Sequence, residues 1–336
     1  MDIAKTDAPP APTRADAPAA RLLDWSLLLA IIVMGSSSFA MIHAAVETVS
    51  PAAVVTLRLW IGAGVLYAVM RGSGLRYPAL LEGGRLAPVW RSMAAVGLVG
   101  FAAPFGLFPW AQQFAPSGLA GVYMAFMPLW TAGLAWAFAG ERMTARKALG
   151  FGLGFAGVAI LMGPTALEAG ALGASGLDDP LFVAQAAFML AAFLYAASAV
   201  LSRRAPPTPP RAYSAGVLLC AAVFASVSVL VAPPDPSRWS AVSIANVVAL
   251  GVFPTAIGAL FIIVIIGRVG ASFMALANYF TPVGAVAIGA ALYGERLEPR
   301  AFFALGVILL GVFISQRRKS VAAAAAQTGY RPLDRG

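Results

Sequence analysis

The chain has 336 residues, of which 60% are hydrophobic and 11% are charged, and its mean hydropathy is +0.83. Soluble domains carry about 25% charged residues because their surfaces face water, so this composition excludes a soluble globular protein and indicates one that is dissolved in lipid. The net charge of +9 does not indicate nucleic-acid binding, because the basic residues form short clusters between apolar runs.

Ten apolar segments of the length that a membrane-spanning helix needs, about 20 residues, follow one another along the chain. Polar residues separate these segments, which we place at Trp25–Val46, Ala52–Met70, Val89–Gln112, Gly118–Ala139, Ala148–Gly163, Leu181–Ser202, Tyr213–Val231, Ser240–Ile266, Ser272–Tyr293 and Phe302–Ser315. Residues 1–24 lack the basic start of a cleaved signal peptide, so we expect a retained, disordered cytoplasmic tail. Residues 317–336 are expected to form a basic cytoplasmic tail.

The basic residues predict the orientation of these helices, because cytoplasmic loops collect Lys and Arg. If the N-terminus is cytoplasmic, only Arg238, Arg296 and Arg300 fall in external loops. Both termini are therefore predicted to be cytoplasmic. Residues 164–179 contain Glu168, Asp178 and Asp179 but no basic residue, which indicates an external loop that connects two halves.

The two halves repeat one another at a shift of 154 residues. The shift places Pro128 on Pro282, Gly140-Glu141-Arg142 on Gly294-Glu295-Arg296, and Gly157-Val158 on Gly311-Val312. Each repeat, residues 25–163 and 180–316, then has five helices, and the odd number inverts the second copy in the membrane. Inverted repeats that hold a substrate near the bilayer midplane are typical of secondary transporters.

These motifs resemble the EamA-type exporters of the drug/metabolite transporter superfamily. The resemblance covers residues 25–315 and rests on Gly35–Phe39, Pro51 with Arg58, the run from Gly118 through Pro128 to Arg142, Gly270-Ala271-Ser272, Asn278 with Pro282, and Gly294–Leu297. One departure is Met34, where the family commonly has Trp. The resemblance implies a ten-helix protein of the bacterial inner membrane that exports amino acids, including aromatic ones, or other small metabolites and drugs.

His43 and Arg58 fall within predicted helices, where ionisable groups are functional candidates. His43 shares a helix face with Ser36 and Phe39, so it either projects into a polar cavity or is a neutral histidine with one hydrogen-bond partner. Arg58 lies about two turns into its helix from Pro51. It either binds a substrate carboxylate or bonds helix-end carbonyls, and we favour the structural role because the arginine recurs in a family with diverse cargo.

A substrate cavity is predicted around the two repeated prolines, since Pro128 and Pro282 each remove a backbone hydrogen bond and can act as hinges. Aromatic and Met side chains there are expected to bury an apolar group while a few polar groups orient its head. The predicted lining is Ser37, His43, Trp110, Tyr123, Met127, Asn278 and Tyr279. Gln185 and Tyr195 are weaker candidates, and the Gly-Glu-Arg turns are expected to cap helices.

The residue inventory also limits the chemistry. One cysteine, Cys220, and one histidine exclude a disulfide and a multi-histidine metal site, and no phosphate-binding loop is present. We therefore expect no enzyme activity, cofactor, metal or nucleotide, and partners limited to a small-molecule substrate and the lipid bilayer. No Asp or Glu is predicted deep in a helix, which favours a facilitator that uses alternating access. A proton-coupled multidrug or metabolite exporter, with His43 as coupling group, and a pore-type channel are the alternatives.

Overall fold

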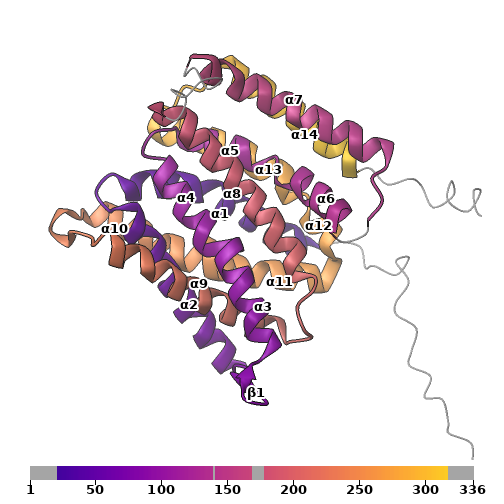
Figure 1. The fold of residues 1–336 in the computed structure, drawn as a ribbon. Coiled ribbons are helices and arrows are strands. Elements are labelled where there is room, and N and C mark those ends of the chain that lie inside the picture. The colour runs from indigo at the N-terminus through magenta and orange to yellow at the C-terminus, as the bar shows by residue number, and fades with distance from the viewer. Residues whose placement is uncertain (1–20, 139–140, 169–177, 317–336) are drawn as a thin grey trace, which may run out of the picture.

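The computed structural model describes residues 21–138, 141–168 and 178–316, which form a bundle of helices with one short hairpin (Figure 1). The first half contains α1 (Leu22–Val46), α2 (Pro51–Gly72), the hairpin β1 (Leu81–Glu82) and β2 (Arg85–Leu86), α3 (Pro88–Gly97), the π-helix η2 (Leu98–Ala102), α4 (Ala103–Ala111), α5 (Ser117–Met124), α6 (Met127–Phe138) and α7 (Ala145–Glu168). The predicted tails lie outside the described residues.

The second half repeats this order. It contains α8 (Pro180–Ser202), α9 (Pro210–Val231), the 3-10 turn η4 (Pro236–Arg238), α10 (Ala241–Leu250), the π-helix η5 (Gly251–Ile257), α11 (Gly258–Val269), α12 (Ala271–Met274), α13 (Ala277–Tyr293) and α14 (Pro299–Gln316). In the described residues nine helical segments are long and apolar enough to cross a membrane, and the tenth predicted segment is divided into α12 and α13. The prediction of a helical membrane protein is confirmed.

Helix boundaries follow local sequence signals. Proline occupies the first position of α2, α3, α8, α9 and α14, where its missing N–H costs no hydrogen bond. The Asp179 carboxylate caps α8 by accepting from the Phe182 N–H at 2.8 Å, and the Ser240 hydroxyl caps α10 by accepting from the Ser243 N–H at 3.0 Å. Gly294 ends α13 in the left-handed conformation, at a φ of 64°.

Four of the apolar segments contain a break or a π-helix that the apolar pattern did not predict. α5 ends at Met124, whose carbonyl loses its donor because Pro128 has no N–H. The matching break in the second half falls before Ala277, and α13 continues through Pro282, so the two prolines are not structurally equivalent. The π-helices η2 and η5 begin at Leu98 and Gly251, close to the repeat shift of 154.

The connecting loop between the halves is shorter than predicted. α7 continues past Gly163 through Pro164 to Glu168 instead of ending before the proline. Thr165 in this extra turn is buried, and its hydroxyl accepts from the Gln185 side-chain amide at 3.2 Å. This contact packs the extra turn against α8. The polar residues that separate the apolar runs do not predict such a contact.

The helices pair across the two halves. α2 packs on α9, α5 on α13 and α7 on α14, and each pair joins helices at equivalent repeat positions. Figure 1 shows α7 and α14 side by side as a layer along one edge of the bundle. The first helix of each half also packs on a helix of the other half: α1 packs on α13, and α8 packs on α6. The pairing places α1, α5, α8 and α13 at the centre of the molecule.

Candidate functional site

Small residues bring α1, α5 and α13 together at the junction of the halves. A Cβ added to Gly121 on α5 would collide with Ala285 on α13, and one added to Gly284 would collide with Ser36 on α1. The Ser36 hydroxyl donates to the carbonyl oxygen of Thr281 at 2.9 Å. The small-residue stretch of α1 is therefore explained by close helix contact.

Tyr123 is the most buried of the predicted lining residues. Its side chain is 0% exposed, and its hydroxyl donates to the Gln185 side-chain oxygen at 2.8 Å. Gln185 in turn donates to Thr165, so three helices share one buried hydrogen-bonded chain. Phe188 packs beside the Tyr123 ring at a centroid distance of 6.0 Å. Gln185, a weaker candidate in the sequence, is thus the direct partner of Tyr123.

The other predicted lining residues contact separate partners. Trp110 is 36% exposed and packs edge-on against Phe114, and the Tyr279 hydroxyl donates to the Gln316 side-chain oxygen at 2.9 Å. The Ser37 hydroxyl bonds within its own helix, to the carbonyl of Met34 at 3.3 Å. Met127 and Asn278 are half-buried at the starts of α6 and α13. These contacts do not assemble the predicted lining into one closed site in this conformation.

His43 lies near the end of α1 beside Tyr293. The two rings meet edge to face at 5.0 Å between centroids, and the Tyr293 hydroxyl donates to the carbonyl of Ala40 at 3.0 Å. The Nδ1 atom of His43 is buried and has no hydrogen-bond partner among the described residues. The imidazole therefore has an open polar position, which a solute or a water molecule can satisfy.

Arg58 is buried at the junction of α2, η5 and α4. Its Nε donates to the Thr255 hydroxyl at 2.8 Å, and that hydroxyl donates to the Leu250 carbonyl at 2.7 Å, the acceptor that Pro254 leaves without its α-helical i+4 donor. Gly62 and Gly251 permit this approach, because a Cβ at either would press on Thr255 or Ile61. The sequence signalled Arg58 but not Thr255, whose role follows from the preceding proline.

The Arg58 guanidinium also faces aromatic rings. Its central carbon lies 3.8 Å from the Phe105 ring centroid, a cation–π contact. Phe105 and Phe108 both pack beside Tyr195, with ring centroids 6.2 Å apart in each case. Among the described residues no Asp or Glu forms an ion pair with Arg58. A buried cation without a protein anion is thus placed next to apolar aromatic surface.

The sequence did not predict the ion pair between α1 and α11. Asp24, assigned to the tail, lies in the first turn of α1 with its side chain 2% exposed, and it pairs with Arg268 of α11 at 2.5 Å. The missed signal is the single acid at the start of an apolar run. Among the described residues no group of three or more His, Cys, Asp or Glu side chains forms a metal site.

Comparison with known proteins identifies the family. The sequence profile of the EamA-like transporter family matches residues 22–163 and 183–316. The chain belongs to the EamA-like transporter family. Both matched segments fall on one half of the helix bundle each, so the family assignment covers the paired helices described above.

Individual relatives extend this assignment. A probable terminal-alkyne amino-acid exporter of Streptantibioticus cattleyicolor is 26% identical over 88% of this chain and 93% of its own length. The uncharacterized inner membrane transporter YedA of Escherichia coli K12 is 27% identical over 86% of this chain and 89% of its own. A crystal structure at 22% identity has a TM-score of 0.59 over 88% of this chain and 98% of its own, which supports the fold alone. The prediction of a multi-pass inner-membrane transporter is confirmed.

Proposed function

We propose that this EamA-like transporter is a secondary exporter that works by alternating access between two inverted repeats, with both termini in the cytoplasm. The observation that carries the proposal is the pair of interrupted helices, α5 with α6 and α12 with α13, at corresponding positions of the two halves. α5 and α13 pack on each other at the centre of the bundle. Interrupted helices in corresponding positions are the sites where secondary transporters bind substrate.

The surroundings of Arg58 favour an amino acid with an apolar or aromatic side chain as the cargo. Arg58 offers a guanidinium with one of its five donors used, and carboxylates are the anions that it binds best. The neighbouring Phe105, Phe108 and Tyr195 rings offer apolar surface for the side chain. The relative from Streptantibioticus cattleyicolor, named for an amino-acid cargo, supports the same class.

The remaining predicted residues keep their proposed roles as lining. Ser37, His43, Met127, Asn278 and Trp110 are half-buried or partly exposed, and their proposed role is to contact solute along its path through the bundle. Tyr123 is fully buried against α8 and is expected to contact cargo after α5 and α8 separate. Pro128 fits a hinge role directly, because α5 and α6 are separated two residues before it.

A facilitator is the energetic mode that the buried groups favour. Within the described helices, Asp24 is in the first turn of α1 and is paired with Arg268, which leaves His43, in the last turn of α1, as the candidate coupling group. In proteoliposomes we therefore expect saturable downhill flux of neutral amino acids, with no accumulation under an imposed pH gradient. The variant His43→Gln should keep this flux, because an amide also satisfies one polar contact.

Protein-free vesicles and a competition series of amino acids and amphipathic drugs are the controls. Uphill accumulation driven by the pH gradient and abolished by His43→Gln would replace the facilitator with a proton-coupled exporter. If none of the tested zwitterionic and amphipathic solutes is transported, the transport proposal is rejected.

A further inference from the structure

The glutamates of the two Gly-Glu-Arg motifs share one backbone hydrogen bond at the repeat shift. The Glu295 N–H donates to the Gly289 carbonyl at 3.3 Å, and the Glu141 N–H donates to the Ala135 carbonyl at 3.2 Å. Glu141 precedes Glu295 by 154 residues, and Ala135 precedes Gly289 by the same number. The repeat therefore preserves this backbone hydrogen bond of the glutamate.

Glu295 uses this position to join the two halves. Its Oε1 accepts from the Ser117 N–H at 2.8 Å and its Oε2 accepts from the Gly118 N–H at 2.9 Å, at the start of α5. Gly289 makes room for the carboxylate, since a Cβ there would collide with it. A carboxylate that accepts two backbone N–H groups forms charge-assisted bonds, which are stronger than neutral ones. This contact holds the start of α5 against the end of α13.

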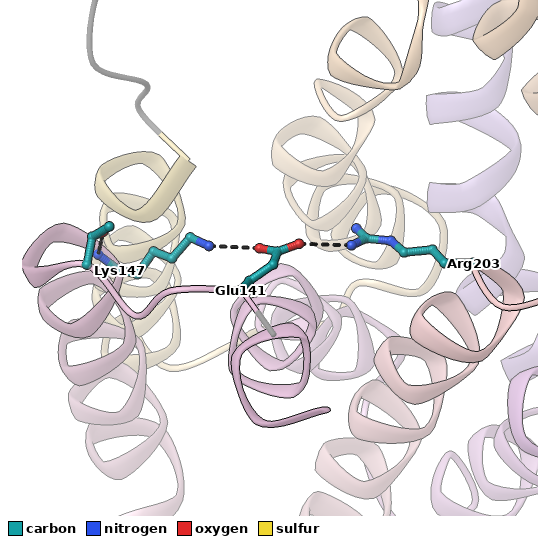
Figure 2. A network of polar contacts seen from close by, with 4 residues as sticks. Glu141, Lys147 and Arg203 are labelled. Atoms are coloured by element: carbon teal, nitrogen blue, oxygen red, sulfur yellow. Dashed lines mark hydrogen bonds and ion pairs between the residues drawn. The ribbon is translucent and has the colours of Figure 1, made fainter. Parts of the chain in front are cut away.

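Glu141 uses the equivalent position differently in this structure. The partners of its two carboxylate oxygens are Lys147 Nζ at 2.9 Å and Arg203 Nη1 at 3.1 Å, as Figure 2 shows. The Glu141 side chain is 41% exposed, so both ion pairs are open to solvent. Solvent-exposed pairs of this kind contribute little to stability and exchange partners at low cost. The Lys147 hydrogen bond lowers the pKa of the Glu141 carboxyl, which favours its ionised form.

The repeat shift identifies the partner that Glu141 would take. Residues 117 and 118, which Glu295 holds, correspond to residues 271 and 272 at the start of the segment that contains α12 and α13. In this structure α12 packs on α11, whereas α6 packs on α8. α6 and α12 therefore pack on different helices in this structure, whereas α5 and α13 pack on each other.

We propose that Glu295 and Glu141 are the two alternating latches of the transport cycle. Glu295 closes its end of the bundle by holding the N–H groups of residues 117 and 118, as observed. In the opposite conformation Glu295 releases them, and Glu141 leaves Lys147 and Arg203 to hold the N–H groups of residues 271 and 272. The latch proposal depends on the proposed alternating access, and it specifies which contact closes each end of the bundle.

The test measures the opening of the Glu295 end by cysteine labelling of the full chain in detergent. Cys220 is first replaced by Ala, and Val286→Cys places a thiol on α13 in the contact with Gly118, where Val286 is 8% exposed. Cysteine is smaller than valine, so the reporter does not force the helices apart. The maleimide labelling rate then follows the population in which this interface is open.

Glu295→Gln is expected to raise the labelling rate about tenfold, the factor that corresponds to the loss of about 1.4 kcal/mol from one charge-assisted hydrogen bond. Glu141→Gln, on the opposite end, is expected to lower the rate, because it weakens the latch of the competing conformation. The double variant should return towards the parent rate. Glu298→Gln is the matched control, since Glu298 lies in the same loop and pairs with Arg300 instead of α5.

An unchanged rate in Glu295→Gln, or a change of the same sign in both single variants, would overturn the latch proposal. The labelling needs no substrate, which separates this proposal from the proposed function. Opposite shifts without any solute flux would keep the latches and reject transport of the tested solutes. Flux with no opposite shifts would reject the latches alone.

Discussion

Replacing Gly150 with leucine is expected to remove most of the folded protein. Gly150 on α7 faces the backbone of α14, where an added Cβ would collide with the Gly311 carbonyl oxygen and lie 3.0 Å from the Ser315 nitrogen. Backbone atoms cannot move away as a side-chain end can, so α7 and α14 must separate. Overpacking of this kind costs about 3 kcal/mol, a large share of the stability of a typical domain.

The matched control is Gly152→Leu on the same helix, because nothing lies within 4 Å of a Cβ at Gly152. Both variants add the same apolar side chain to α7, and only Gly150 faces α14. The measurement is the melting temperature and the yield of monodisperse protein in detergent. Equal melting of the two variants would contradict the close backbone contact between α7 and α14.

Replacing Arg58 with methionine is expected to abolish transport of carboxylate-bearing cargo while the protein still folds. Methionine is unbranched and apolar, so it packs against the aromatic rings and avoids the cost of a buried cation. Loss of the charge-assisted contact to a substrate carboxylate, about 2.7 kcal/mol, lowers the transport of amino acids about 100-fold. Arg58→Lys keeps the charge without the two-pronged geometry and should retain part of the activity.

A second cargo separates binding from packing. The parent protein should prefer an amino acid to the corresponding amine, which lacks the carboxylate, and Arg58→Met should lose that preference. Arg238→Met is the control, because Arg238 is exposed in the turn before α10. If Arg58→Met lowers the melting temperature and the surviving protein still prefers the amino acid, Arg58 has the structural role that the sequence analysis favours.

The apolar pattern predicted the helices well, because lipid requires about 20 apolar residues for each crossing. It did not predict where helices are interrupted. The break before Pro128 follows from a missing N–H, yet α13 runs through Pro282, since the surrounding packing decides whether a proline interrupts a helix. Extension of α7 to Glu168 depends on the buried Thr165 contact, which no local pattern encodes.

For the polar contacts too, the sequence indicated one residue of each pair, and the fold alone defines its partner. The Gly-Glu-Arg motif predicts a cap at a neighbouring helix start; Glu141 forms ion pairs instead, whereas Glu295 caps a helix start in the other half. Its partner, the start of α5, is 178 residues away and is defined only by the fold. Arg58 was visible as a charge in an apolar run, whereas Thr255, its partner, resembles any threonine until α2 and η5 meet. Asp24 was assigned to the tail because its burial depends on Arg268.

Solute counterflow in proteoliposomes tests the central claim, an alternating-access carrier for neutral amino acids, most directly. Vesicles are preloaded with unlabelled phenylalanine and diluted into labelled phenylalanine at low concentration. A carrier whose site faces one side at a time exchanges the two, so labelled solute should accumulate transiently above its external concentration. Uptake that is independent of preloading and does not saturate would contradict the carrier and indicate a continuous pore.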